Sequence, residues 1–231
     1  MIKKYNSKGF TITELVIATA VFSVVLMLGV VGFVQIGKQF YKGVSVSQTR
    51  DIASQIMNAI TSDIRLSQGG VQNVGFQTTD PTTGTTTSLD GYCIGNHIYV
   101  VHTSYLVNLS QHDNSYKFGI LQAPLPSNNN CPQPIQPSDL VNPVEMLGDN
   151  MRVSFLLLQN QLAGNLNPSV QNLSFLTDLM VTYGDDGAFT TGTAQSNDPL
   201  NPPVCNSVAS GSQFCAVVRL TSTTSVAPTG G

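Results

Sequence analysis

The chain has 231 residues, of which 41% are hydrophobic and only 10% are charged. This charged share is well below the roughly 25% of an average soluble domain, and Asn, Gln, Ser and Thr supply polarity in the second half instead. Beyond Leu66, three basic residues stand against ten carboxylates, a net charge of −7. Because proteins bind nucleic acids largely through cations that neutralise phosphates, direct nucleic-acid binding by this region is not expected.

The N-terminal region predicts a membrane-spanning helix. The first nine residues, MIKKYNSKG, are basic, and an uncharged, mostly apolar run of 23 residues extends from Leu15 to Gly37. A helix at about 1.5 Å per residue makes this run roughly 35 Å long, enough to cross the hydrocarbon core of a membrane. Lys38 and Lys42 mark its far end.

The next segment predicts that the same helix continues as an amphipathic one. It places Ile52, Ile56, Ile60 and Ile64 four residues apart, with Ala53 and Met57 beside them. This spacing gives an apolar stripe that must pack against another element. Gly69 and Gly70 are expected to end the helix, which would then exceed fifty residues.

After Gly70, β-rich runs alternate with long loops. The predicted strands are 97–107, 116–122, 151–158, 179–183 and 214–221, with Phe214, Ala216, Val218 and Leu220 on one face of the last. Residues 111–115 and 184–187 are interpreted as turns, and 78–91, 124–143 and 190–212 as loops. The expected fold is α+β, a long N-terminal helix packed on a mainly antiparallel β-sheet head with disulfide-pinned loops.

The four cysteines, Cys93, Cys131, Cys205 and Cys215, all lie after residue 90. Their even number and the lack of C-x-x-C spacing favour two disulfides in an oxidising compartment over a zinc site. Three connectivities are possible. Pairing Cys93 with Cys131 and Cys205 with Cys215 is favoured because each bond then closes one long loop, contributing about 2–4 kcal/mol.

Neither a metal site nor an active site is expected. His97, His102 and His112 lack metal-binding spacing on a helix, and His97 and His102 point to opposite faces if they share a strand. Asp185 and Asp186 are interpreted as turn residues, with a cation site as the alternative. The sequence has no nucleophile elbow, HExxH motif or phosphate loop, so we expect neither an enzyme nor a cofactor.

Glu14 is the unusual residue of the apolar segment. An ionisable side chain within a membrane is costly and needs a partner, yet Lys8 lies six residues away on a different helical face. Cleavage after Gly9 would give Phe10 a free amino group, charged at neutral pH, one helical turn from Glu14. A carboxylate there also relieves the unfavourable interaction between that cation and the helix dipole.

The segment KGFTITELVIATAVFSVVLMLG resembles the class III signal sequence of type IV pilins and type II secretion pseudopilins. A basic leader ends in Gly9, Phe10 and a Thr-rich step follow, and Glu14 occupies the fifth mature position before the apolar run. The resemblance implies cleavage between Gly9 and Phe10 by a prepilin peptidase and N-methylation of Phe10. It also implies that Glu14 pairs with the amino terminus of a neighbouring subunit.

The same resemblance implies a domain organisation and a role. Residues 1–9 would be a removed leader, 10–37 the transmembrane and filament-core half of the helix, 38–68 its amphipathic half, and 69–231 a β-rich head. The large head resembles the larger minor pilins of the PilW type and the J-type minor pseudopilin. We therefore expect a minor pilin that helps to prime filament assembly, with a J-type minor pseudopilin of type II secretion or a surface-adhesive pilin as alternatives.

The implied partners are major and other minor pilins, the prepilin peptidase and the inner-membrane assembly platform. The implied location is the inner membrane, crossed once, and then an extracytoplasmic filament at the cell surface. A conventional secretory signal fits less well, because the small-residue site at 18–20 comes too early and Glu14 stays unexplained. An uncleaved single-pass anchor that carries an extracytoplasmic domain is the simplest alternative.

Overall fold

A computed structural model describes residues 10–67, 70–79, 84, 86–103, 105–107, 118–126, 130–162, 173–190, 198–206 and 212–226. The chain divides into two compact units between Tyr41 and Lys42. Helix α1 contributes to both units, and each is described by itself.

The predicted long helix is confirmed. α1 runs from Ile12 to Leu66, 55 residues with no proline. Its last turn is closed by Ser67, whose amide and hydroxyl both donate to the carbonyl of Ile64, at 3.2 and 2.7 Å. Gly70 follows with a φ of +75°, in the left-handed region that favours glycine.

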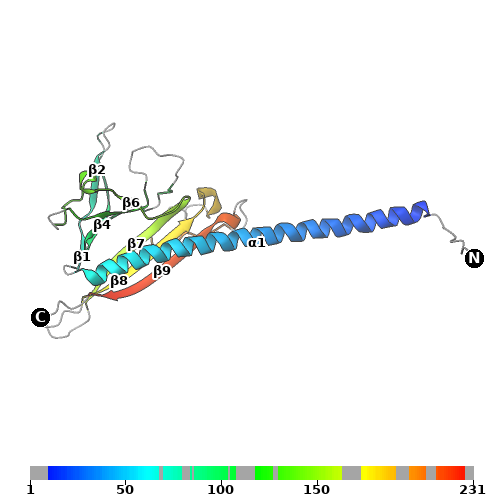
Figure 1. Cartoon of the computed structure of the whole chain (residues 1–231). Coiled ribbons are helices and arrows are strands. Elements are labelled where there is room, and N and C mark those ends of the chain that lie inside the picture. The colour runs from blue at the N-terminus through cyan, green and yellow to red at the C-terminus, as the bar shows by residue number, and fades with distance from the viewer. Residues whose placement is uncertain are drawn as a thin grey trace, which may run out of the picture. The chain divides into compact units, whose positions relative to one another are not determined.

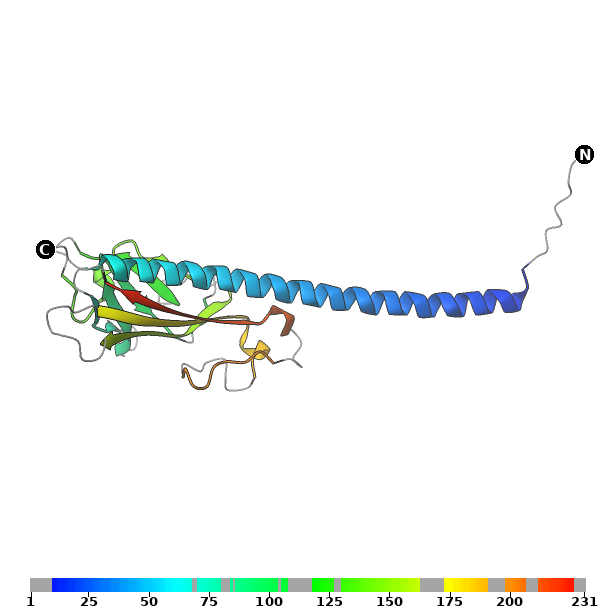
Figure 2. The ribbon, with the colours of Figure 1, turned by 90° about the horizontal axis from the view of Figure 1, so that it is seen from below.

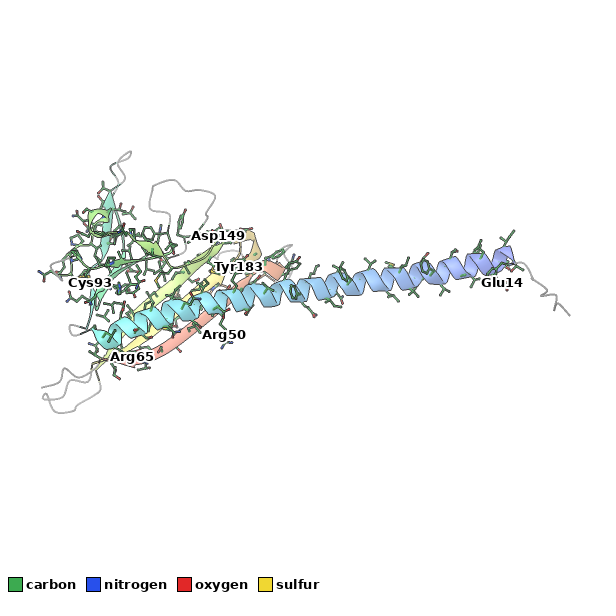
Figure 3. The ribbon with its side chains drawn as sticks, viewed as in Figure 1. Glu14, Arg50, Arg65, Cys93, Asp149 and Tyr183 are labelled. Carbon is green, nitrogen blue, oxygen red and sulfur yellow. A yellow bond between two sulfur atoms is a disulfide. The ribbon has the colours of Figure 1, made fainter. Side chains whose placement is uncertain are left out.

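The predicted apolar stripe is also confirmed. Ala53, Ile56, Ile60 and Ile64 are at most 1% exposed and Met57 is 6% exposed, while Ile52 packs at the edge of the same cluster. Arg50 and Arg65 lie on the solvent side of the helix (Figure 3). The stripe packs on strands of both sheets and forms the main core of the second unit with them.

The first sheet has six strands in the order β1-β3-β4-β5-β6, with β2 also pairing with β3. Every pair in it is antiparallel. The strands are β1 (Val71–Asn73), β2 (Phe76–Thr79), β3 (Thr86–Ile94), β4 (His97–Val101), β5 (Ile120–Pro124) and β6 (Val144–Glu145).

Both faces of this sheet are buried. Tyr92, Ile94, Tyr99 and Val101 join the core formed with α1. The alternate side chains of the same strands, including Cys93, Ile98 and Val100, pack on the other face with Phe118 and Ile135. Successive side chains of a strand point to opposite faces, so this burial explains the continuous apolar run at 98–101.

The second sheet is an antiparallel meander of β7 (Met151–Leu162), β8 (Leu173–Tyr183) and β9 (Ala216–Ser225). One extra residue in β7, between Val153 and Phe155, shifts its register against β8. The C-terminal half of α1 lies across one face of this sheet (Figures 1 and 2). Short 3-10 helices occur at Pro137–Asp139, Asp186–Ala188 and Ser212–Phe214.

Several predicted boundaries were wrong. Strand β4 ends at Val101 rather than at residue 107, and β7 and β8 are longer than expected. Residues 78–91 are not one loop, because β2 extends to Thr79 and β3 begins at Thr86. Phe214 belongs to a 3-10 helix, not to β9. The predicted turn at 111–115 lies outside the described residues.

Two disulfides pin the head, in the connectivity that loop closure favoured. Cys93 of β3 bonds to Cys131 across 38 residues, and Cys205 bonds to Cys215 across 10 residues. Cys93 and Cys215 are buried, at 4% and 0% exposure. Each bond therefore ties a long connection to the packed interior.

Candidate assembly site

Glu14 and Thr11 form a reciprocal cap at the start of α1. The Thr11 amide donates to Glu14 Oε2 at 3.0 Å and the Thr11 hydroxyl donates to the same oxygen at 2.7 Å. In return, the Glu14 amide donates to Thr11 Oγ1 at 3.3 Å. This is the geometry of a capping box, which satisfies amide groups that the helix itself leaves free.

The N-terminal part of α1, which follows Glu14 and extends to Gly37, is apolar on all sides. Its charge-free segment is long and apolar enough to cross a membrane, and its side chains are exposed around the whole helix (Figure 3). Ile12, Met27 and Phe33, for example, are 82%, 70% and 80% exposed. Such a surface is stable only in lipid or against other apolar helices, which fits membrane anchoring.

The structure brings together part of the predicted site. Phe10 lies directly before the Thr11–Glu14 cap, as expected from the sequence. Gly9, the residue before the predicted cleavage, lies outside the described residues. Cleavage, methylation of Phe10 and the pairing of Glu14 with a neighbouring chain stay predictions.

Thr11 is the residue that the sequence interpretation missed. That interpretation includes it only in a Thr-rich step, although Thr11-Ile12-Thr13-Glu14 has the T-x-x-E spacing of a capping box immediately before an apolar run. Glu14 therefore has a hydrogen-bond partner within its own chain, and this partner is not a cation.

A second polar cluster joins α1 to the first sheet. Asp63 accepts hydrogen bonds from the Tyr99 hydroxyl at 2.6 Å and, through the same oxygen, from His97 Nδ1 at 2.7 Å. Gln122 Nε2 donates to the Tyr99 oxygen at 2.9 Å. Burial raises the pKa of Tyr99 and the Asp63 carboxylate raises it further, so the phenol stays protonated and donates. The cluster fixes the last turns of α1 on β4.

We expect Asp63→Asn to lower the free energy of unfolding by about 2 kcal/mol, because a neutral amide oxygen accepts these two hydrogen bonds more weakly than the charged carboxylate does. The measurement is chemical denaturation of the full chain in detergent. Asp51→Asn, at an exposed position of the same helix, is the matched control. Equal stability of both variants would show that Asp63 does not hold α1 on the sheet.

His97, His102 and Asp186 contact other side chains of the head. His97 faces α1, whereas His102 stacks on Tyr105 and contacts Phe118 on the opposite face, as predicted. His112 lies outside the described residues. Asp186 accepts from Arg152 Nη1 at 2.6 Å, and no group of three or more possible metal ligands occurs within the described ranges.

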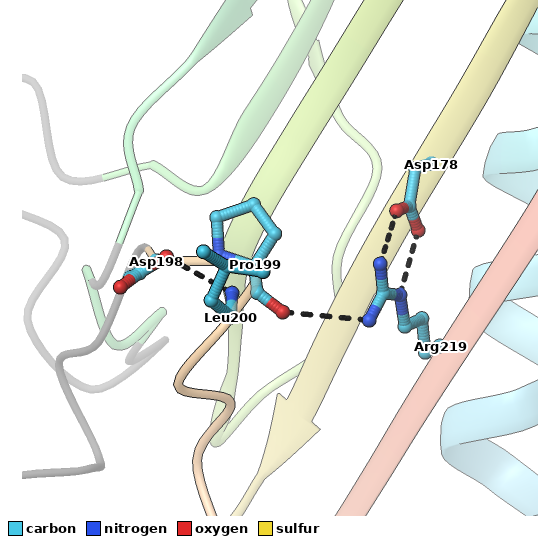
Figure 4. Close-up of polar contacts among 5 residues, drawn as sticks. All are labelled: Asp178, Asp198, Pro199, Leu200 and Arg219. Atoms are coloured by element: carbon cyan, nitrogen blue, oxygen red, sulfur yellow. Dashed lines mark hydrogen bonds and ion pairs between the residues drawn. The ribbon is translucent and has the colours of Figure 1, made fainter.

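A covering segment, residues 184–190 and 198–206, lies on the side of the second sheet away from α1 (Figure 2). Arg152, 1% exposed, bonds to Asp186 and to the carbonyl of Gly184. Arg219 of β9 makes a bidentate pair with Asp178 of β8, at 3.0 and 2.6 Å, and reaches the carbonyl of Pro199 at 3.5 Å (Figure 4). Two arginines and the Cys205–Cys215 bond thus hold this segment on the sheet.

Glu145 is a partly buried acid whose role the sequence did not indicate. Its carboxylate accepts backbone hydrogen bonds from Gly119, Ile120 and Leu147 at 2.9 to 3.0 Å. Burial nevertheless raises its pKa above the ordinary value. These contacts attach the short strand β6 to β5.

Comparison with known proteins identifies the N-terminal segment. The family described as the prokaryotic N-terminal methylation motif matches residues 4–30. This range holds Phe10, Thr11, Glu14 and residues 15–30 of the apolar segment. No curated protein and no solved structure shows significant similarity to the chain, so the assignment comes from these residues and from the helix they begin. With its apolar helix and its antiparallel, disulfide-linked head, the chain carries the methylation motif of type IV pilin-like and pseudopilin proteins.

Proposed function

We propose that this protein is a minor pilin, a structural subunit that joins a type IV filament and helps to prime its assembly. The observation that carries the proposal is Glu14, a capped carboxylate in the first turn of a helix whose first half is otherwise apolar on all sides. A charge there is costly in lipid, and a neighbouring chain that brings a protonated amino terminus would compensate it. The matched methylation motif supports such an amino terminus at Phe10.

In this proposal the prepilin peptidase cuts between Gly9 and Phe10, and Phe10 is then methylated. Removal of Lys3, Lys4 and Lys8 with the leader takes away the cations that hold this end of the helix on the cytoplasmic side. The apolar half of α1 packs with the helices of major and other minor pilins, and the head contacts their heads. The protein is a substrate of the peptidase and not itself an enzyme.

The deciding experiment is N-terminal mass spectrometry on protein recovered from membranes of the native host. A chain that begins at Phe10 and carries an extra methyl group supports the pilin pathway. A chain that begins at Met1 or beyond residue 30 refutes it. Deletion of the gene then distinguishes a type IV pilus from a type II secretion system. Loss of filaments supports a minor pilin, and loss of protein secretion supports a J-type minor pseudopilin.

We expect Gly9→Leu to leave most of the protein unprocessed, because a bulky side chain at the residue before the cleaved bond hinders the peptidase. Gly9→Ala is the matched control and should still be processed. The readout is the fraction of chains that begin at Phe10. Efficient processing of Gly9→Leu would move the cleavage site away from this bond.

A further inference from the structure

In the cap at the start of α1, only one of the two carboxylate oxygens of Glu14 accepts hydrogen bonds from Thr11. Both hydrogen bonds from Thr11, one from its amide and one from its hydroxyl, go to Oε2. Within the described part of the chain, Oε1 receives neither a hydrogen bond nor an ion pair. The hydrogen bonds to Oε2 therefore hold the carboxylate in place, while Oε1 can accept a hydrogen bond from another chain.

We infer that Thr11 is a positioning residue for assembly, which fixes the Glu14 carboxylate so that Oε1 meets the protonated amino terminus of a neighbouring subunit. This inference rests on the proposed function. A free glutamate side chain loses rotamer freedom when it binds a partner. Thr11 removes part of that freedom beforehand, and the geometry needed for a charge-assisted hydrogen bond is set before the neighbour arrives.

The contacts of Thr11 are compatible with removal of the leader. The two donors are the amide and the hydroxyl of Thr11, and both lie on the C-terminal side of the predicted cleavage between Gly9 and Phe10. The Glu14 amide, which donates back to Thr11 Oγ1, also stays in the mature chain. The same cap can hold Glu14 in the precursor and in the processed subunit.

The test compares three hydroxyl variants of the full chain in the native host. Thr11→Val removes the hydroxyl but keeps the shape, Thr11→Ser restores it, and Thr19→Val removes a hydroxyl that donates to the carbonyl of Val16 instead. Isotope-labelled peptides quantify the processed protein that enters filaments. We expect Thr11→Val to reduce this fraction about tenfold, while Thr11→Ser and Thr19→Val stay within twofold of the natural chain.

A double-mutant cycle separates positioning from a general effect on the helix end. Glu14→Gln keeps an oxygen that accepts from Thr11 but removes the charge that pairs with the amine. In this background we expect Thr11→Val to change incorporation less than twofold, because no ion pair is left to be oriented. A tenfold loss in both backgrounds would assign Thr11 to the helix end alone and overturn the inference.

The remaining outcomes are also decisive. Unprocessed Thr11→Val protein would assign the residue to recognition by the peptidase, and normal incorporation of Thr11→Val beside a defective Glu14→Gln would show that Glu14 needs no positioning. Each overturns this inference but leaves the proposed function standing. If Glu14→Gln is incorporated normally, or if the natural chain never enters filaments, the proposed function fails and this inference fails with it.

Discussion

Replacement of Glu14 by alanine is expected to leave removal of the leader nearly intact and to reduce incorporation into filaments about a hundredfold. The variant would leave the amino terminus of a neighbouring subunit without its counter-charge in apolar surroundings, and removal of one partner from such a pair is strongly destabilising. Leader cleavage should persist because the basic residues, Gly9 and Phe10 are unchanged.

The measurement is the ratio of filament-bound to membrane-bound processed protein, determined by quantitative mass spectrometry. Asp51→Ala is the matched control, since it removes an exposed carboxylate from the same helix and should assemble normally. Normal incorporation of Glu14→Ala would exclude the pairing with a neighbouring amino terminus, and the capping box with Thr11 would then be the whole role of Glu14.

The second large effect concerns the disulfides. We expect Cys93→Ala/Cys131→Ala to lower the free energy of unfolding by about 4 kcal/mol, and Cys205→Ala/Cys215→Ala to lower it by about 3 kcal/mol. The difference follows from the chain closed by each bond, 38 against 10 residues, because a longer loop loses more entropy in the unfolded state.

The two double variants control for each other, since each pair joins one buried cysteine to one partly buried cysteine. Chemical denaturation of the full chain in detergent gives both values. If removal of the Cys205–Cys215 bond lowered the free energy of unfolding more, the main contribution of that bond would be to anchor the covering segment. Loop entropy would then be the smaller contribution. In that case the Arg152 and Arg219 contacts would be expected to weaken with the bond.

The sequence predicted the helix and its buried stripe well, because isoleucines spaced four residues apart over a long span are typical of one face of a helix. It predicted β3 poorly. Residues Thr86–Ile94 include a Ser-Leu-Asp-Gly stretch that is typical of turns, and pairing with β1, β2 and β4 overrides this local preference. Strands β1 and β6 have three and two residues, too few for any periodicity to appear.

At the candidate site, the sequence predicted the position of Glu14 but not its partner. Thr11 could have been found from T-x-x-E spacing. The Asp63 cluster could not, because Asp63 and Tyr99 are 36 residues apart and meet only after the helix and the sheet have packed. Contacts between distant segments depend on tertiary structure, which local patterns do not carry.

The stripe of α1 between Ala53 and Ile64 packs on strands of both sheets, and this has a practical consequence for producing the head as a water-soluble fragment. A truncation that starts at Lys42 removes the apolar half of the helix yet keeps every buried residue of the stripe. A truncation that starts after Gly70 would remove the helix that packs on both sheets, and it would expose an apolar surface prone to aggregation. The chain should therefore be cut within the helix, near Tyr41, and not at the end of the helix where a domain boundary would ordinarily be placed.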